Sequence, residues 1–130
     1  MNNTTDNGIA RQFSTGATRG TSDGKLDYEG SLCPFVLELF VQYMHKNRIQ
    51  SDGKLRTADN WQKGIPKEEY MKSKQRHSMA YWKKTRSNKT YLTIKETYEN
   101  LVAENNDLCG ELFNTMGILH ENLKEMGKME

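Results

Sequence analysis

The chain has 130 residues, of which 35% are hydrophobic and 28% are charged. A chain of this length normally forms one domain. So little apolar material builds only a modest core, which predicts pairing with copies of itself into a homo-oligomer. The charge is nearly balanced, with 19 basic and 17 acidic residues, which argues against a general nucleic-acid binder with its usual basic excess. A basic stretch at 67–89 is a local exception; its interleaved aromatic residues leave phosphate contact as an alternative, but we interpret it as a solvated helix face.

The sequence has few features that would indicate a membrane segment, a disulfide bond or a cysteine metal site. The N-terminal residues lack the apolar segment of a signal peptide, and no stretch is long enough for a transmembrane helix. Cys33 and Cys109 lie far apart and in no metal-binding spacing, which is typical of free thiols in a reducing compartment. These features predict a cytoplasmic protein without a membrane partner.

Residues 1–30 are rich in Gly, Thr, Ser, Asn and Asp. This composition cannot bury enough apolar surface to hold itself ordered. We therefore expect a flexible, loop-like N-terminal arm at 1–30 and a helical domain at 31–130. Within the arm, small residues at 13–20 surround Arg19. This segment either wraps a phosphate through its backbone N–H groups or is plainly disordered, and no Walker-type ending decides between the two.

Two helices are expected in the first half of the domain. Pro34 suits the first turn of a helix with an apolar stripe that extends to about Arg48. Pro66 begins a second helix, which extends to about Thr85 and has acidic residues in its first turn.

A long C-terminal helix is expected to follow a capping box at 93–96. Its apolar stripe, which we expect to be the buried face, consists mainly of leucines and continues almost to the end of the chain. Gly110 and Gly117 lie inside this pattern and mark either a break or close contact with a neighbouring helix. No run of alternating β-branched residues demands a sheet, so the predicted fold class is all-α, a small helical bundle.

An acidic row lies on the predicted C-terminal helix. At about 100° per residue, Glu104, Asp107 and Glu111 fall on one arc. Mg²⁺ prefers oxygen ligands, and carboxylates on facing helices are a recurrent metal platform. The bland alternative is a solvated acidic face. Glu38 stands among apolar neighbours, where a carboxylate needs a cation or a hydrogen-bond partner; this favours the metal site, although Arg76 would serve as a purely structural partner.

Three other side chains are candidates for ligand contact. Arg76 can hold a phosphate in bidentate fashion. Its neighbour His77 can act as a base, a ligand or a simple hydrogen-bond bridge. Trp61 stands in a polar segment, so its ring either packs into the core, the commoner outcome, or stacks on a planar ligand such as a base.

Several segments resemble a known family. Residues 13–19, 24–30, 36–38, 43–46, 59–66, 70–73, 76–77, 112–114, 117 and 119–121 are similar to the phage dATP/dGTP diphosphohydrolase N-terminal domain, a relative of the MazG-like all-α pyrophosphohydrolases. The Asn-Trp-x-Lys-Gly block at 60–64 and the Arg76-His77 pair are the most specific parts. The resemblance implies a phage or prophage enzyme of the bacterial cytoplasm that cleaves purine (deoxy)nucleoside triphosphates to monophosphate and pyrophosphate with Mg²⁺ or Mn²⁺.

The resemblance also implies roles for individual residues. The implied metal ligands are Glu38, Glu104, Asp107 and Glu111. The implied nucleotide contacts are Arg19, Trp61, Lys63 and Arg76. The implied catalytic residues are Glu38, His77 and Asp107.

One departure from the family pattern suggests an alternative. Several relatives carry Asp where this chain has Ala80, and the end of the second helix is more basic here. If that Asp takes part in turnover, the chain binds without cleaving. The alternative function is a non-catalytic phage protein that sequesters a host immune signalling nucleotide.

Overall fold

The computed structural model describes residues 10–86 and 103–128. The chain divides into two units, Met1–Cys33 and Pro34–Glu130, whereas the sequence placed a boundary between residues 30 and 31. Every buried side chain among the described residues belongs to the second unit. The structure is mostly helical, which confirms the predicted all-α fold class. Within the described ranges, no helix is long and apolar enough to cross a membrane.

The first unit contains a short antiparallel hairpin that the sequence did not predict. Its strands are β1 (Ala10–Gln12) and β2 (Thr18–Gly20). Gly16 supplies the turn with a φ of 88°, a conformation that favours glycine. Almost all of its side chains are exposed. Its strands therefore lack the alternation of apolar and polar residues by which a strand is predicted from sequence.

A single helical turn, α1 (Tyr28–Ser31), also lies in the first unit. The side chain of Asp27 caps it by accepting a hydrogen bond from the backbone N–H of Gly30 at 2.7 Å. Residues 1–9 of the predicted arm lie outside the described residues.

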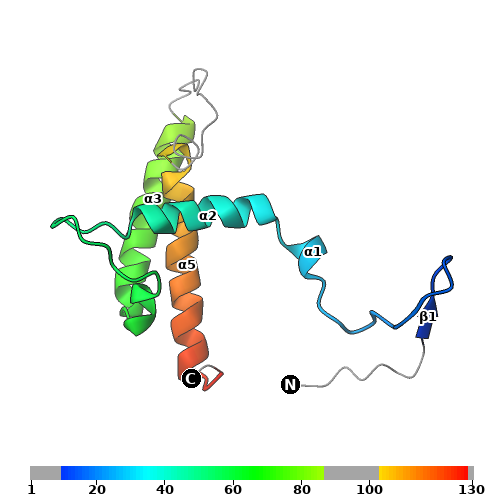
Figure 1. Cartoon of the computed structure of the whole chain (residues 1–130). Coiled ribbons are helices and arrows are strands. Elements are labelled where there is room, and N and C mark those ends of the chain that lie inside the picture. Colours follow the sequence, from blue (N-terminus) through cyan, green and yellow to red (C-terminus); the bar gives the residue numbers. More distant parts are fainter. Residues whose placement is uncertain (1–9, 87–102, 129–130) are drawn as a thin grey trace. The chain divides into compact units, whose positions relative to one another are not determined.

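Within its described residues, the second unit is built mainly on helices, whose arrangement Figure 1 shows. Helix α2 (Pro34–Lys46) crosses α5 (Asn106–Glu125), and α3 (Lys67–Arg86) lies side by side with α5. The predicted spans of the first two helices agree with α2 and α3 within two residues at each end. The capping box at 93–96, where the third helix was expected to begin, lies outside the described residues.

Helices α3 and α5 approach each other closely at two glycines of α5. A Cβ atom on Gly117 would come within 2.3 Å of the ring of Tyr70, and one on Gly110 would come within 2.5 Å of Nε2 of His77. Gly110 and Gly117 are seven residues apart on α5, and their partners His77 and Tyr70 are seven residues apart on α3 in the opposite order. The two contacts therefore follow one another along a single antiparallel helix pair. Helix α5 runs unbroken through both positions. Of the two predicted alternatives, close contact is therefore confirmed.

The leucine stripe of α5 is not its buried face, contrary to the prediction. Its leucines keep between 38% and 58% of their surface exposed, and they are Leu108, Leu112, Leu119 and Leu123. The buried residues of α5 are Cys109, Gly110, Asn114 and Gly117. Small residues let the α3 backbone come closer than leucines would, which is why the polar, glycine-containing side of α5 packs on α3.

The hydrophobic core is small. Phe40 and Tyr43 of α2 pack with Cys109 of α5, and each of these side chains is less than a tenth exposed. Partly buried apolar side chains surround this cluster; they are Leu39, Met44, Phe113 and Met116. This core holds the C-terminal half of α2 against the first half of α5 and thereby builds one wall of the site.

Candidate functional site: a pocket with two arginines

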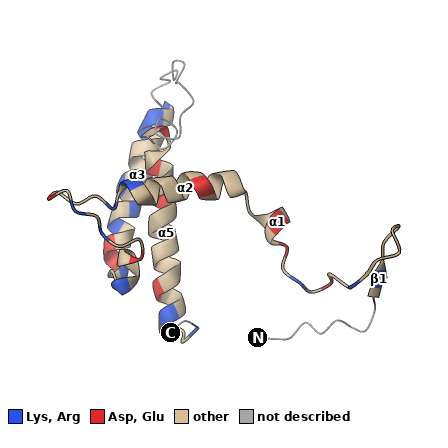
Figure 2. Ribbon diagram, in the orientation of Figure 1, with Lys and Arg blue, Asp and Glu red and all other residues tan. Residues whose placement is uncertain are grey.

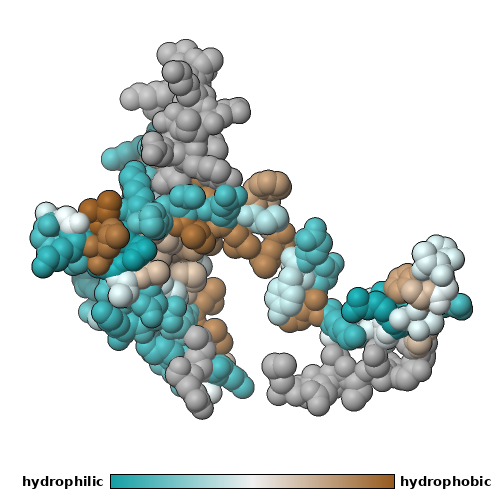
Figure 3. Space-filling view, in the orientation of Figure 1, coloured by the Kyte–Doolittle hydropathy of each residue, from teal (hydrophilic) through white to brown (hydrophobic). Residues whose placement is uncertain are grey.

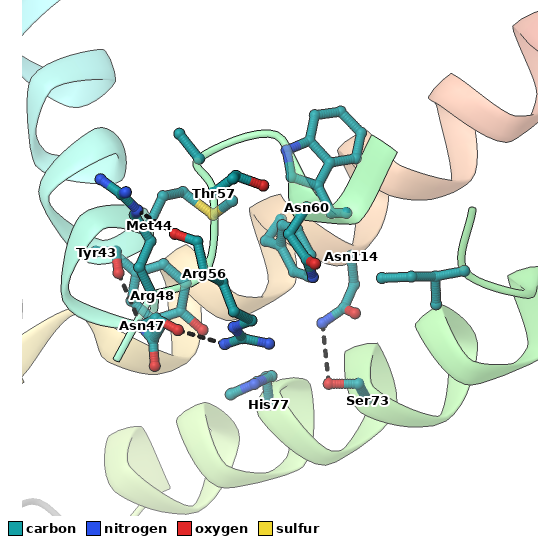
Figure 4. Close-up of a pocket in the computed structure, with 14 residues that line it drawn as sticks. Tyr43, Met44, Asn47, Arg48, Arg56, Thr57, Asn60, Ser73, His77 and Asn114 are labelled. Carbon is teal, nitrogen blue, oxygen red and sulfur yellow. Dashed lines mark hydrogen bonds between the residues drawn. The ribbon is translucent and has the colours of Figure 1, made fainter. Parts of the chain in front are cut away.

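A pocket of about 230 Å³ lies within the second unit. Its walls come from α2, α3, α5 and the segment between α2 and α3, as Figure 4 shows. The lining combines two arginines, three asparagine amides, one imidazole and an indole. These groups are Arg48, Arg56, Asn47, Asn60, Asn114, His77 and Trp61.

A small hairpin places the two arginines side by side. Ile49 and Leu55 form an isolated antiparallel bridge, and Gly53 turns the chain with a φ of 82°. As a result the backbone N–H of Arg56 donates to the carbonyl of Arg48 at 2.8 Å. Two arginines on one wall give the pocket a positive side.

Each guanidinium is also oriented by a backbone carbonyl. Nε of Arg48 donates to the carbonyl oxygen of Arg56 at 2.7 Å, and Nη2 of Arg56 donates to the carbonyl of Asn47. These bonds use a single nitrogen of each group, whereas a guanidinium carries five N–H donors in a planar fork. Each guanidinium therefore keeps further N–H donors, the kind of group that binds an anion such as a phosphate.

Trp61 stands on the 3₁₀ helix η1 (Asn60–Lys63) at the edge of the core. Its ring meets Phe113 at a centroid distance of 6.2 Å and His120 at 4.7 Å, both edge to face. The ring is only half-buried and also lines the pocket. The ring thus packs beside the core against Phe113 and His120 and also presents part of its surface to the pocket, so both predicted alternatives stay open.

His77 is fixed in the pocket wall by a carboxylate. Its Nδ1 lies 3.0 Å from Oδ1 of Asp107, while Nζ of Lys84 lies 2.8 Å from Oδ2. Burial alone would raise the pKa of Asp107, but hydrogen bonds and charge from Lys84 and His77 outweigh it and hold that pKa below its ordinary value. Because an ionised carboxylate can only accept hydrogen bonds, Nδ1 of His77 bears the hydrogen of this bond and is its donor.

Asn114 is the most deeply placed polar group of the pocket, with only 2% of its surface exposed. Its Nδ2 donates to the carbonyl of Gly110 at 2.7 Å and to Oγ of Ser73 at 3.2 Å. Figure 4 shows Asn114 and Ser73 joined across the two helices. These bonds lock the amide and leave Oδ1 as an acceptor at the pocket.

Two further polar groups beside the core are held neutral. Burial raises the pKa of Tyr43, and the negative charges of Cys109 and Asp107 would raise it further. Burial likewise raises the pKa of the Cys109 thiol. Tyr43 therefore offers the pocket a neutral hydroxyl, and Cys109 is not an activated nucleophile.

The predicted nucleotide contacts do not come together in this pocket. Trp61 lines it, but Lys63 and Arg76 are exposed and are not part of its wall. Arg76 precedes His77 on α3 and so points about 100° away from it. Arg19 is exposed in the first unit.

The predicted metal ligands also remain apart. The prediction that Glu38 lies close to the core is wrong, because the side chain is exposed on the polar strip of α2. Both carboxylate oxygens of Asp107 are already held by His77 and Lys84. Glu104 and Glu111 are half-buried. Across residues 10–86 and 103–128, no three His, Cys, Asp or Glu side chains gather closely enough to hold a metal ion, so these residues do not fit the implied Mg²⁺ site.

Sequence reasoning missed Arg48, Arg56 and Asn114 as site residues. A signal for the arginines was present, since they stand four residues on either side of Asp52 in the Ser51-Asp52-Gly53 turn, where a hairpin makes them neighbours. Asn114 had no such signal, because its burial depends on the close packing of α3 on α5.

Comparisons of the chain with protein-family models, curated proteins and solved structures find no match.

Proposed function

We propose that the protein binds a nucleotide through its phosphate in the arginine pocket. The observation that carries this proposal is the pair Arg48 and Arg56, oriented by backbone carbonyls on one wall. Both line a pocket that also includes the imidazole of His77. Arginine forks are the side chains best matched to phosphate oxygens.

The opposite side of the pocket fits the rest of a nucleotide. Trp61 offers an aromatic surface for a base, and the amide groups of Asn60 and Asn114 offer hydrogen bonds to polar groups of the nucleotide. Ligand pockets commonly enclose about 300–1,000 Å³, and this one encloses about 230 Å³. A single phosphate with its sugar fills this space, so the base lies at the rim against Trp61. The purine preference comes from the family resemblance.

Binding without cleavage is the form of this function that the geometry supports. A divalent metal at Asp107 would have to displace both Lys84 and His77 from the carboxylate. Together with Ala80, this favours a protein that sequesters a signalling nucleotide in the cytoplasm of an infected bacterium. The second candidate is the Mg²⁺- or Mn²⁺-dependent diphosphohydrolase of dATP and dGTP that the family resemblance implies.

Binding is tested by isothermal titration with dAMP, dGMP, dATP and dGTP. Arg56→Ala removes a charge-assisted hydrogen bond of about 1.5–3 kcal/mol, so we expect affinity to fall roughly tenfold or more. Arg76→Ala is the matched control, because this exposed arginine lies outside the pocket wall, and it should bind like the wild type. Absence of binding for all four nucleotides, or equal affinity of Arg56→Ala and wild type, would sink the proposal.

The same ligands separate the two candidate functions. The protein is incubated with dATP or dGTP and Mg²⁺ or Mn²⁺, and pyrophosphate is followed by ³¹P NMR. Recovery of intact nucleotide from the complex supports the binder. Pyrophosphate release that disappears in Asp107→Asn would instead establish the hydrolase and contradict binding without cleavage.

We also propose that the chain works as a homo-oligomer. The described residues bury only four hydrophobic side chains below a tenth of their surface, which are Phe40, Tyr43, Tyr70 and Cys109. A core of this size provides little of the apolar burial on which folding depends. Association of copies would supply the missing burial.

A further inference from the structure

Among the residues that the structure describes, Asn114 is the one buried side chain that carries an amide or a charge. Polar side chains mostly lie at the surface, and Figure 3 shows hydrophilic, teal atoms over the visible surface of α3. Water satisfies hydrogen-bonding groups there, whereas a buried amide must find its partners in the protein or in a ligand. Each hydrogen-bonding atom of Asn114 therefore has to be accounted for.

The orientation of the Asn114 amide is fixed by its partners. Its Nδ2 lies 2.7 Å from the carbonyl oxygen of Gly110, about one turn earlier on α5. A carbonyl oxygen can only accept a hydrogen bond, so the amide nitrogen and not Oδ1 must face it. The second hydrogen of Nδ2 is donated to Oγ of Ser73 at 3.2 Å. Both donors of the amide are thus used inside the protein.

The amide oxygen of Asn114 takes part in neither of these bonds. Across the described residues, the hydroxyl of Tyr70 is the single fully enclosed side-chain atom that lacks a hydrogen bond, so Oδ1 of Asn114 is unpaired but not sealed off. Because Asn114 lines the pocket, the pocket is the space to which Oδ1 is open. An acceptor built into a pocket wall in this way selects a ligand that can donate to it.

The neighbouring hydroxyl of Ser73 complements this acceptor. Ser73 also lines the pocket, and its Oγ accepts a hydrogen from Asn114, so its own hydrogen remains available for donation. Figure 4 shows the two side chains reaching toward each other from α5 and α3. The wall therefore presents an acceptor and a donor together. A ligand hydroxyl, which both donates and accepts hydrogen bonds, satisfies both groups.

The ligand group that meets this wall is uncharged. No carboxylate is found among the described residues that line the pocket, and Figure 2 shows mostly uncharged, tan ribbon in the middle of α5. An ammonium group would lie here without a countercharge, in a pocket that already holds Arg48 and Arg56, and burial of such an unpaired charge is costly. The arginines meet the charge of the phosphate, so Asn114 faces a neutral part of the same ligand.

We infer that Asn114 and Ser73 bind a sugar hydroxyl, so that the pocket selects nucleotides with a free 3′-hydroxyl. This inference rests on the proposed binding of the phosphate by the two arginines. With the phosphate at the arginines and the base at the rim against Trp61, the sugar is the part of the nucleotide that reaches the buried amide.

The 3′-hydroxyl is the sugar hydroxyl that ribonucleotides and deoxyribonucleotides share. A 3′,5′-cyclic mononucleotide carries an ester oxygen at this position and has no hydrogen to donate to Asn114. Recognition of the hydroxyl therefore places such cyclic mononucleotides outside the class of ligands and favours linear nucleotides with a terminal phosphate.

Isothermal titration of the wild type compares dAMP with its 2′,3′-dideoxy analogue. The two ligands have the same base and the same phosphate and differ only in the 3′-hydroxyl. Loss of the donor to a buried acceptor should weaken binding roughly tenfold or more. Equal affinity for the two ligands would overturn this inference and leave the phosphate proposal intact, whereas no binding of either ligand would overturn the proposed function as well.

Two variants assign the discrimination to Asn114. In Asn114→Ala, dAMP should bind no more tightly than the dideoxy analogue, because the acceptor is gone. Asn60→Ala is the matched control, since it removes another amide from the pocket lining and should weaken both ligands alike, with their affinity ratio unchanged. A folded Asn114→Ala protein that keeps the wild-type ratio would overturn the role of this residue.

NMR keeps the test decisive if Asn114→Ala unfolds, since this substitution also removes the link between α5 and α3. The side-chain amide resonances of Asn114 in the wild type are compared between the complexes with saturating dAMP and with the saturating dideoxy analogue. We expect different chemical shifts, because only dAMP donates a hydrogen bond to Oδ1. Identical shifts in the two complexes would overturn the inference.

Discussion

At the scale of single residues, Asp107 has the most constrained environment in the candidate site. Its side chain is 13% exposed and lies between a histidine and a lysine of α3. Sequence spacing assigned it to a row of metal ligands, but spacing along one helix says nothing about which cations the neighbouring helix brings. Here α3 supplies Lys84 and His77, so a structural ion pair stands where a metal ligand was expected.

This ion pair predicts a pH dependence of stability. The pKa of Asp107 is lower in the folded chain than its ordinary value, so the folded state binds fewer protons than the unfolded state as pH falls below about 4. The ionised Asp107 contributes fully to the free energy of unfolding above about pH 4, and this contribution is lost as the pH falls through the pKa of Asp107 in the folded chain. At pH 7, Asp107→Asn should reduce the free energy of unfolding by about 1–3 kcal/mol, nearer the lower figure because Lys84 is partly exposed.

Urea denaturation of wild type and Asp107→Asn at pH 7 and pH 3 measures this effect. The difference between the two proteins should shrink at pH 3, since the unfolded chain then takes up a proton at Asp107 and the stabilisation that comes from the lowered pKa of the folded carboxyl begins to be lost. Glu38→Gln is the control, because Glu38 is exposed and its replacement should alter stability by less than about 0.5 kcal/mol at either pH. A difference that stays constant with pH would contradict the assigned ionisation.

At the scale of elements, the contact between α3 and α5 determines the site. Gly110 and Gly117 let the rings of His77 and Tyr70 lie directly on the α5 backbone. The same close approach buries Asn114 and leaves the leucine stripe outside. Hydrophobic periodicity predicted α2 and α3 within two residues, yet it chose the wrong face of α5, because it counts large apolar side chains and ignores the close approach that small ones permit.

Gly117→Ala should destabilise the protein through this contact. The added Cβ would lie 2.3 Å from the ring of Tyr70, and the resulting overpacking costs about 1–3 kcal/mol. Alanine returns up to about 1 kcal/mol through its better helix propensity, so we expect a net loss of about 1–2 kcal/mol in chemical denaturation.

A double-mutant cycle identifies the cause. With Tyr70→Ala already present, the ring is gone, and Gly117→Ala should be neutral or stabilising. Gln75→Ala, at an exposed position of α3, provides the baseline for a harmless helix substitution. If Gly117→Ala were equally destabilising with and without Tyr70, the ring contact would not be the reason.

At the scale of the whole molecule, the two units have different physical characters. The residues described in Met1–Cys33 form short elements with mostly exposed side chains, whereas Pro34–Glu130 contains the core and the pocket. Composition predicted this contrast, because the Gly-, Ser- and Thr-rich first part has little apolar surface to bury.

Removal of residues 1–33 should leave the second unit folded. We expect the shortened chain to keep its helical circular dichroism signal and its free energy of unfolding within about 0.5 kcal/mol. Nucleotide titration of the same protein tests Arg19, the predicted phosphate contact of the first unit. Unchanged affinity would exclude a role for Arg19, and a large loss of stability would show that the first unit supports the core.

The sequence by itself determined the helical class, the spans of α2 and α3, the polar first unit and a thin core, because these follow from local composition and periodicity. Tertiary structure alone decided which side of α5 is buried and that Asp107 pairs with Lys84 and His77. It also decided that Arg48 and Arg56 share one pocket with Trp61. These features depend on distances between segments far apart along the chain, and no local pattern encodes such distances.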